Sequence, residues 1–346
     1  MALIAVTSAG GSPGASTTAW GTALGWGSAC LFVEADPTGS SALAAGWFRG
    51  EVLPTERTVA DLSIPARDGR LAEALPNFVG RVPGTEVFVL PGARGHAQAG
   101  GISADIWASV GGVLTSGTNA LDTIVDVGRL GLAGSPRPLL AAADLTLLVL
   151  RNDLPGIIGA QSWAKALREL RSGLSQGLGL VLVTPGVRTR RRGVLTSTPR
   201  EIARVLGLPV VATVPDAPDE AAVFSHGVPP SRRRSALAEA YVAVGHRARL
   251  AIEAGVGALE DDAAGGGSSG RSATMTPAHA AATAGRAAGG AARSAAGSGG
   301  TSEARPAHAG TPAHAGTPVH AGTPAAPGVP VPPGTPAPGV SPGGAP

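Results

Sequence analysis

LIAVTSAGGSPGASTT, residues 3 to 18, is the stretch of sequence that decides the fold. Residues 3–6 form a short apolar run that predicts a buried strand, and a glycine- and serine-rich turn after it leads into a helix. In such a unit the backbone N–H groups of the turn and the positive end of the helix dipole face one point, which suits a phosphate. The stretch therefore predicts a nucleotide-binding turn at the start of an α/β domain.

The Walker A pattern, G-x-x-x-x-G-K-[ST], fits this turn except at two positions. Gly14 stands at its second glycine and Ser16 at its Mg²⁺-binding hydroxyl. Ala9 takes the place of the first glycine and Ala15 that of the lysine. The only lysine of the chain is Lys165, so no other alignment restores the cation. Because that cation acts on the β- and γ-phosphates during phosphoryl transfer, we expect weak ATP binding with little or no hydrolysis.

We expect the phosphates to contact the turn and the first residues of its helix: Gly10, Gly11, Ser12, Pro13, Gly14, Ala15, Ser16 and Thr17. Two structural alternatives stay open here. The glycines could form an empty strand–helix turn, because glycine adopts positive φ at little cost. Ser16 could be only a helix N-cap, because serine is a preferred residue at that position.

Two carboxylates follow strands further along the chain. The apolar run at 121–126 ends in Asp126, a Walker B arrangement in which the carboxylate holds Mg²⁺ together with Ser16. Asp36 follows the predicted strand at 29–33, and acidic residues at the carboxyl ends of parallel strands lie where ligands bind. Asp36 precedes Pro37, so a turn-forming role is its alternative.

Apolar runs alternate with helical segments up to about residue 255, which predicts a doubly wound, mostly parallel sheet covered on both faces. The expected strands are 3–6, 29–33, 87–90, 121–126, 145–150, 178–183 and 210–214, and the expected helices are 17–26, 102–114, 155–170, 199–206, 217–225 and 235–254. Residues 256–346 are rich in Ala, Gly, Pro and Thr, with PAHAGT repeats. They predict a disordered tail, and the spacing of its histidines, His308, His314 and His320, follows from the repeat rather than from metal binding.

The net charge of +3 lies in residues 263–346, where four arginines face one glutamate, so residues 1–262 are neutral. A neutral domain argues against strong DNA binding, because affinity for DNA depends on phosphate neutralisation. We interpret Arg188, Arg190–Arg192 and Arg232–Arg234 as solvated loop charge rather than binding patches. Cys30, in an apolar strand, predicts a buried thiol. The absence of a signal-like N-terminus and of a long apolar span predicts a cytoplasmic protein.

The order of these motifs resembles the ParA/MinD family of deviant-Walker P-loop ATPases. The family's cradle, K-G-G-x-G-K-[ST]-[ST], is matched by residues 10–17, with Gly10 and Ala15 at its two lysines and Ser12 at one of its glycines. Its D-x-D-P-Q-G element is matched by residues 34–39, and its Walker B by residues 124–126. The resemblance implies a SIMIBI-type domain that binds ATP and Mg²⁺ and forms a homodimer, with Asp36 as the catalytic carboxylate near the attacking water.

Three further features qualify the resemblance. The ending Val214-Pro215-Asp216 is similar to the family loop near adenine, but Thr184-Pro185 stands where the family has a base-reading Asn. Arg129 and Arg151 could supply a substitute cation, although exposed ion pairs are the expected role of each.

The small residue in the cradle most resembles the TadZ/CpaE branch or MinD-like proteins of actinobacteria. This implies a spatial regulator or scaffold with protein partners, such as Tad-type pilus or secretion machinery, at a polar location. The alternative is an active ParA/MinD ATPase that partitions chromosomes or places the division site.

Overall fold

A computed structural model gives the structure of the chain. It describes residues 1–10, 12–39, 41–51, 53–116, 120–170, 177–185, 195–229 and 235–254. Gly11, the arginine clusters at 188–192 and 232–234, and the predicted tail with its repeats lie outside the described residues. Everything below concerns the described part, which falls within one unit, Met1–Arg271.

The centre of the fold is an eight-stranded sheet with the order β3-β4-β2-β5-β1-β6-β7-β8. Its strands are β1 (Leu3–Ser8), β2 (Cys30–Glu34), β3 (Gly80–Arg81), β4 (Val87–Leu90), β5 (Asp122–Arg129), β6 (Leu145–Arg151), β7 (Gly177–Pro185) and β8 (Val210–Asp216). All neighbours are parallel except β3 and β4, which form an antiparallel hairpin at one edge. β1 lies between β5 and β6, where the chain changes its direction across the sheet, and ligands of open α/β sheets bind at such a switch point.

Helices cover both faces of this sheet. The α-helices are α1 (Ala15–Leu24), α2 (Ser63–Arg67), α3 (Leu71–Ala74), α4 (His96–Gly100), α5 (Ala104–Thr115), α6 (Arg137–Ala142), α7 (Leu154–Leu170), α8 (Pro199–Leu206), α9 (Pro218–Ser225) and α10 (Ala236–Ala254). Short 3₁₀ helices lie at η2 (Val59–Leu62) and η3 (Leu75–Phe78), and a π-helical turn lies at η1 (Leu43–Trp47).

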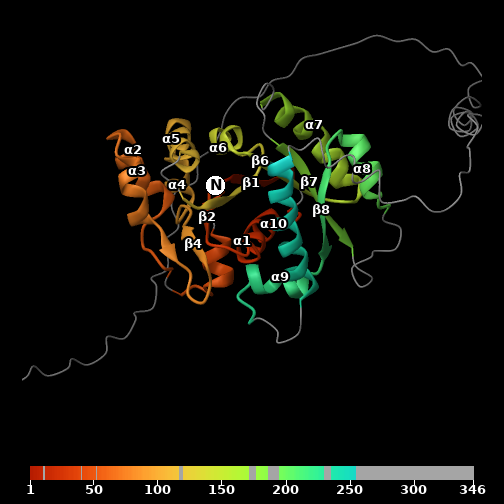
Figure 1. Ribbon diagram of the computed structural model, residues 1–346, viewed down its shortest axis with the longest axis horizontal. Coiled ribbons are helices and arrows are strands. Elements are labelled where there is room, and N and C mark those ends of the chain that lie inside the picture. Colours follow the sequence, from red (N-terminus) through yellow and green to blue (C-terminus); the bar gives the residue numbers. More distant parts are fainter. Residues whose placement is uncertain are drawn as a thin grey trace, which may run out of the picture. The chain divides into compact units, whose positions relative to one another are not determined.

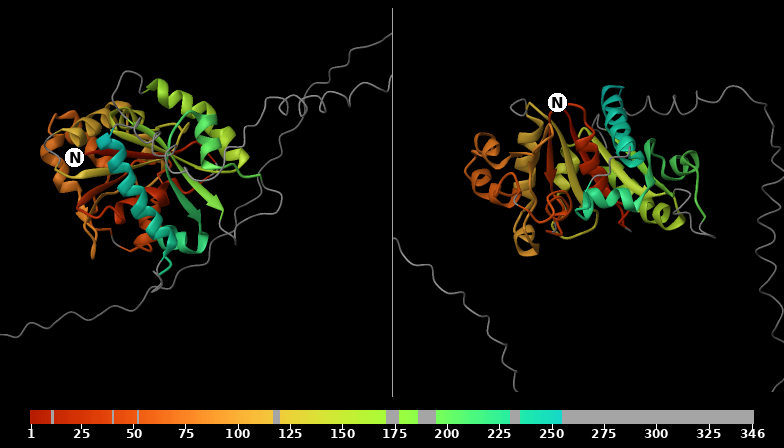
Figure 2. Two further views of the ribbon diagram at one scale, coloured as in Figure 1. Left: turned by 45° about the vertical axis from the view of Figure 1, so that its right-hand side comes forward. Right: turned by 90° about the horizontal axis from the view of Figure 1, so that it is seen from below.

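Two separate apolar cores result from the alternation of side chains along the strands. On β1, Leu3 and Ala5 pack into the core under α5 to α8, whereas Ile4 and Val6 pack into the core under α1, α9 and α10. Figure 1 shows these two groups of helices on opposite sides of the strands, and both views of Figure 2 show the same layering. The doubly wound α/β fold predicted from the sequence is thus confirmed.

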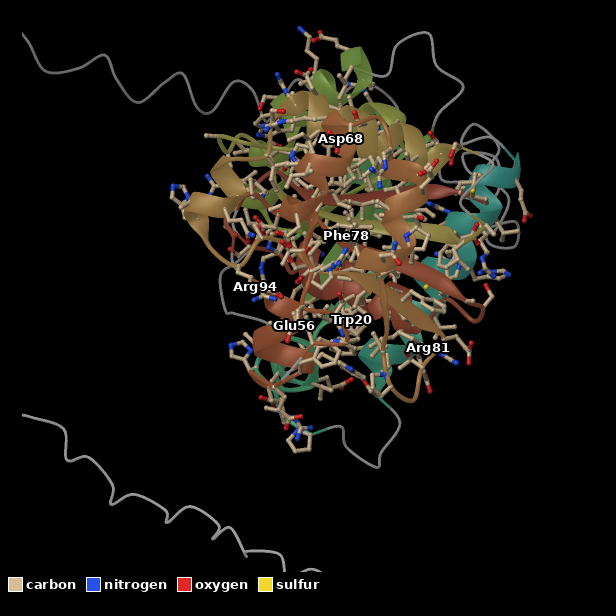
Figure 3. All side chains as sticks on the ribbon, turned by 90° about the vertical axis from the view of Figure 1, so that its left-hand side faces the viewer. Trp20, Glu56, Asp68, Phe78, Arg81 and Arg94 are labelled. Carbon is tan, nitrogen blue, oxygen red and sulfur yellow. The ribbon has the colours of Figure 1, made fainter. Side chains whose placement is uncertain are left out.

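α1 is fixed in place by close contacts on its buried side. A Cβ added to Gly21 would lie 2.1 Å from the Cδ2 atom of Tyr241 in α10, so only glycine permits this approach. Trp20 stacks edge-on against Phe32 and Trp47, with ring centroids 5.0 and 5.6 Å away, and Figure 3 shows it among the core side chains. The helix that begins at the phosphate-binding turn is therefore held rigidly against the sheet and α10.

Several predicted boundaries move. α1 begins two residues earlier than expected, directly after Gly14. The expected helix at 102–114 is confirmed as α5, which begins at Ala104 with Ser103 as its N-cap, accepting a hydrogen bond from the Ile106 N–H. The prediction missed α4, α6 and the two-residue strand β3, whereas the expected strand at 87–90 is confirmed as β4. The prediction that Cys30 is a buried thiol is confirmed, and burial raises its pKa to about 12.

Candidate functional site

The turn between β1 and α1 has the backbone of an anion cradle. Gly14 is the N-cap of α1 with φ 91° and ψ 35°, a left-handed conformation that favours glycine. Within the described residues no side chain caps α1, and its first turn contains no acidic residue. Ser12 also has positive φ, 46°, although it carries a side chain. The amides at the start of α1 are thus left for a ligand or water.

Ser16 lies in the first turn of α1 and is not its N-cap, so the capping alternative is wrong. Its hydroxyl lies beside the carboxylate of Asp126 on β5 and lowers the pKa of that group, against the larger effect of burial. Asp126 is 2% exposed and also accepts the Gly128 N–H at 3.0 Å through its Oδ1 atom. The two residues predicted to hold Mg²⁺ therefore lie beside each other.

Asp126 does not end its strand, which corrects the prediction from the sequence. β5 continues to Arg129, but its register with β1 shifts after Asp126, so that Val6 pairs with Asp126 and Thr7 with Gly128. Gly128 has φ 68°, and its carbonyl accepts the Thr7 hydroxyl at 2.9 Å. Such bulges commonly redirect a side chain beside a functional site.

Asp36 lies on the other side of Gly128. A Cβ added to Gly128 would lie 2.5 Å from the Asp36 Cγ atom, so the carboxylate packs directly over the glycine. The Oδ1 atom of Asp36 accepts the Thr38 N–H at 2.8 Å, which is the turn-forming contact considered above. Asp36 therefore forms the turn and also faces the Asp126 region, where its charge raises the pKa of Asp126.

Glu34 is a third carboxylate at this edge, and it is 5% exposed. It pairs in register with Asp126 across the β2–β5 ladder. Its Oε1 atom accepts the Leu43 N–H and its Oε2 atom the Gly92 N–H, both at 3.1 Å, and the Ser41 hydroxyl donates to it. These contacts tie the loops after β2 and β4 together, so we assign Glu34 a structural role.

Burial raises the pKa of Asp126 from its ordinary 3.8 to about 7. The negative charges of Asp36 and Glu34 raise it as well, whereas the hydrogen bonds from Ser16 and Gly128 lower it. Burial also raises the pKa of Glu34, with opposing hydrogen bonds from its three neighbours. Removal of water from a carboxylate disfavours its charged form, so this edge of the sheet favours protons or a cation.

A pocket of about 190 Å³ adjoins the cradle on the β6–β8 side of β1. The apolar part of its lining comes from β7, β8, α9 and α10 and includes Val183, Val214, Leu237 and Tyr241. Ser12, Pro13, Gly14, Thr17 and Thr18 form the wall on the cradle side. Burial raises the pKa of the Tyr241 hydroxyl, and the neighbouring Thr18 side chain lowers it by less.

Two charged residues meet in the same pocket. Arg151, at the end of β6, forms an ion pair with Asp216, at the end of β8, with 2.5 Å between Nη1 and Oδ2. This is the ion pair expected for Arg151 from the sequence. Thr184 donates its hydroxyl to the Val214 carbonyl at 3.3 Å instead of facing the pocket.

The other cations considered from the sequence lie elsewhere. Lys165 is exposed on α7, with its Nζ atom 3.9 Å from Glu169. Arg129 is exposed at the end of β5 and does not line the pocket, and no ion pair of its own is found among the described residues. Sequence reasoning missed the pairing of Arg151 with Asp216, because no spacing signal links the ends of two strands 65 residues apart.

The residues present fit a hydrated Mg²⁺ ion. Mg²⁺ takes oxygen ligands, keeps several waters and usually binds through one or two protein groups and substrate phosphates. Ser16 and Asp126 supply such oxygens next to an uncapped helix start. Over the described ranges, no three His, Cys, Asp or Glu side chains are grouped so that they could hold a metal ion.

Neither a protein-family model nor a curated protein matches this sequence. Solved structures match it in fold. A ParA family ATPase from Chlorobium tepidum is 18% identical, with a TM-score of 0.56, and 71% of this chain and 97% of that chain are covered. The cell division ATPase MinD of Pyrococcus furiosus is 21% identical, with a TM-score of 0.56 and coverage of 71% and 98%. The septum site-determining protein MinD of Pyrococcus horikoshii, complexed with Mg-ADP, is 20% identical, with a TM-score of 0.54 and coverage of 73% and 97%.

These likenesses define the fold class as that of the P-loop NTPases. More narrowly, the chain has the fold of the ParA/MinD ATPases, as its motifs predicted. The TadZ/CpaE-like or actinobacterial branch stays a prediction. No helix in the described part of the chain combines the length and apolarity needed to cross a bilayer.

Proposed function

We propose that this chain binds an adenine nucleotide with Mg²⁺ and acts as a regulator of the ParA/MinD type with weak or absent ATP hydrolysis. The observation that carries the proposal is the placement of the Ser16 hydroxyl beside the buried Asp126 carboxylate, close enough to lower its pKa. It brings a hydroxyl and a carboxylate together beside the uncapped start of α1. A turn that served only to connect a strand and a helix would not need a buried carboxylate there, because burial of its charge is costly.

Each part of the site has a role in this proposal. The backbone N–H groups of residues 10–12 and 14–16 bind the phosphates, and Ser16 and Asp126 hold the Mg²⁺, which neutralises phosphate charge when bound. Thr17 adds a hydroxyl on the pocket side, and the apolar part of the pocket lining receives the base. Asp36 orients water, if water reaches the phosphates at all.

The missing lysine separates binding from turnover. One preorganised donor in a water-excluded site is worth about 10²–10³ in rate, so a site with Ala15 in place of lysine should be a poor catalyst. We propose that the bound nucleotide instead stabilises a homodimer that recruits partner proteins. Tad-type pilus or secretion machinery, at a polar site in the cytoplasm, is the partner system that the cradle's resemblance favours. Strong DNA binding is not part of the proposal.

Calorimetric titration with ADP and with ATP, each with and without Mg²⁺, tests the nucleotide site. We expect Mg²⁺ to tighten binding to the wild type, and Asp126→Ala to remove that Mg²⁺ effect. Asp105→Ala, which removes an exposed aspartate from the first turn of α5, is the matched control. If the wild type binds neither nucleotide under either condition, the chain is a scaffold with a vestigial site and the proposal is wrong.

A phosphate-release assay tests the second half of the proposal. We expect far slower release than from a P-loop ATPase with an intact lysine. Turnover at the rate of such an enzyme would favour the active partitioning or division-site ATPase instead.

A further inference from the structure

Among the residues that the structure describes, Arg151 is the only arginine in the lining of the pocket beside the cradle. It lies at the carboxyl end of β6, the strand that pairs with β1 immediately before the turn. Ser12, Pro13 and Gly14 of the turn line the same pocket. A site that has lost its lysine thus retains a guanidinium at its margin.

The ion-pair partner of Arg151 is the carboxylate of Asp216. The side chain of Arg151 is 40% exposed and that of Asp216 is 20% exposed. Ion pairs with this degree of exposure contribute little to stability, so their separation costs little. Arg151 can therefore change partners without disturbing the fold.

We propose that Arg151 is the cation of this nucleotide site, and that it exchanges the Asp216 carboxylate for a phosphate of the nucleotide when the pocket is filled. The inference rests on the proposed function. A guanidinium binds phosphate through paired N–H donors and stays charged at all relevant pH values. A nucleotide phosphate carries more negative charge than a carboxylate, and the cradle would hold it next to the same wall of the pocket.

Arg129 is the competing candidate, because it ends the strand on the opposite side of β1. It is exposed, and it does not line the pocket. The proposal therefore predicts that loss of the Arg151 side chain weakens nucleotide binding and that loss of the Arg129 side chain does not.

Titration of ADP without Mg²⁺ into single variants of the full chain tests the exchange. Arg151→Ala should raise Kd by roughly tenfold or more, the worth of a lost charge-assisted hydrogen bond. Asp216→Asn should lower Kd by up to about fivefold, because Arg151 no longer has to leave a carboxylate. A pair with only a structural role predicts that both variants change Kd in the same direction. Changes of Kd in opposite directions therefore support the exchange, and changes of Kd in the same direction overturn it.

Arg81 and Glu86 provide the matched controls. They form an exposed arginine–carboxylate pair on the β3–β4 hairpin, with 2.6 Å between Nη2 and Oε1, at the edge of the sheet away from the pocket. Figure 3 labels Arg81 there. Arg81→Ala and Glu86→Gln should leave Kd unchanged, and Arg151→Lys should recover part of the affinity.

The outcomes separate the two proposals. If wild type binds ADP and Arg151→Ala binds it equally well, or if Arg129→Ala alone weakens binding, the exchange is wrong while the nucleotide site stands. If wild type binds neither ADP nor ATP, the proposed function fails and the exchange falls with it. Thermal unfolding of each variant shows whether a changed Kd reflects a damaged fold. If Arg151→Ala is unfolded, the Kd values of Arg151→Lys and Asp216→Asn decide whether the exchange occurs.

Discussion

Asp126→Asn should make the protein more stable and bind Mg²⁺ less well. The carboxyl of Asp126 is 2% exposed, and burial raises its pKa to about 7. Asparagine has the same size, so its oxygen can still accept the Gly128 N–H and its amide can donate to the Ser16 hydroxyl. The substitution therefore removes a buried charge and keeps the local contacts.

The sign of the effect follows from proton binding. In the unfolded chain the pKa returns to about 3.8, so between pH 4 and 7 the folded protein holds a proton that the unfolded chain has lost. The free energy of unfolding of the wild type therefore falls as pH rises through this window, and the loss is complete above pH 7. A shift of about three pH units at about 1.4 kcal/mol each corresponds to about 4 kcal/mol.

Urea unfolding of both proteins, followed by circular dichroism from pH 4 to pH 8 without nucleotide or Mg²⁺, measures this term. We expect Asp126→Asn to gain stability over the wild type progressively, approaching about 4 kcal/mol at pH 8. The buried Glu34 also has a raised pKa, but it is present in both proteins and its contribution cancels in the difference. A stability difference that is the same at every pH would show that Asp126 is ionised throughout, and the reasoning would fail.

Three further substitutions test the turn and its helix. Ala15→Lys should raise ATP turnover by up to about 10²–10³-fold in a phosphate-release assay, and an unchanged rate would show that the lysine is not what limits this site. Ser12→Gly should raise the free energy of unfolding by up to about 1 kcal/mol, because Ser12 has φ 46° and left-handed backbone costs about 1–2 kcal/mol without glycine. Gly21→Ala should lower thermal stability by about 1–3 kcal/mol through its clash with Tyr241. The control Gly112→Ala in α5, where an added Cβ meets nothing within 4 Å, should raise stability by up to about 1 kcal/mol.

Local patterns were enough to predict the fold and the outline of the site. The turn at residues 10–16 joins the apolar strand β1 to a helix. The two strands that pair with β1, β5 and β6, are also visible in the sequence as mostly apolar runs. The periodicity of apolar residues and the residue types that form turns are encoded within a few residues, so both can be recognised without tertiary structure. Ser16 and Asp126 were paired by motif order alone, and the structure places them beside each other.

What the sequence could not give depends on distant contacts. The bulge after Asp126 requires the register of β1 against β5, and the burial of Glu34 requires donors from two separate loops. α6 was missed because its six residues are too few for a helical period to appear. The Arg151–Asp216 pair depends on the order β6-β7-β8, which no local signal specifies.

Mg²⁺ and the proton should compete for Asp126, and this competition gives the proposed site a testable pH dependence. Asp126 must be ionised to hold the metal, so below its pKa of about 7 each Mg²⁺ that binds has to displace a proton. The Mg²⁺-dependent gain in ADP affinity should be full at pH 8 and fall up to about tenfold per pH unit below pH 7. Binding without Mg²⁺ displaces no proton from Asp126, so the contribution of Arg151 to that binding should not follow the same curve. Calorimetry at pH 5.5, 6.5, 7.5 and 8 compares the wild type with Asp126→Asn, in which the Mg²⁺ gain should be small and its pH dependence lost. The variant also corrects for titration of the nucleotide phosphates, which affects both proteins alike. A wild-type curve parallel to that of Asp126→Asn would mean that the metal is held elsewhere, and the pairing of Ser16 with Asp126 would then be structural only.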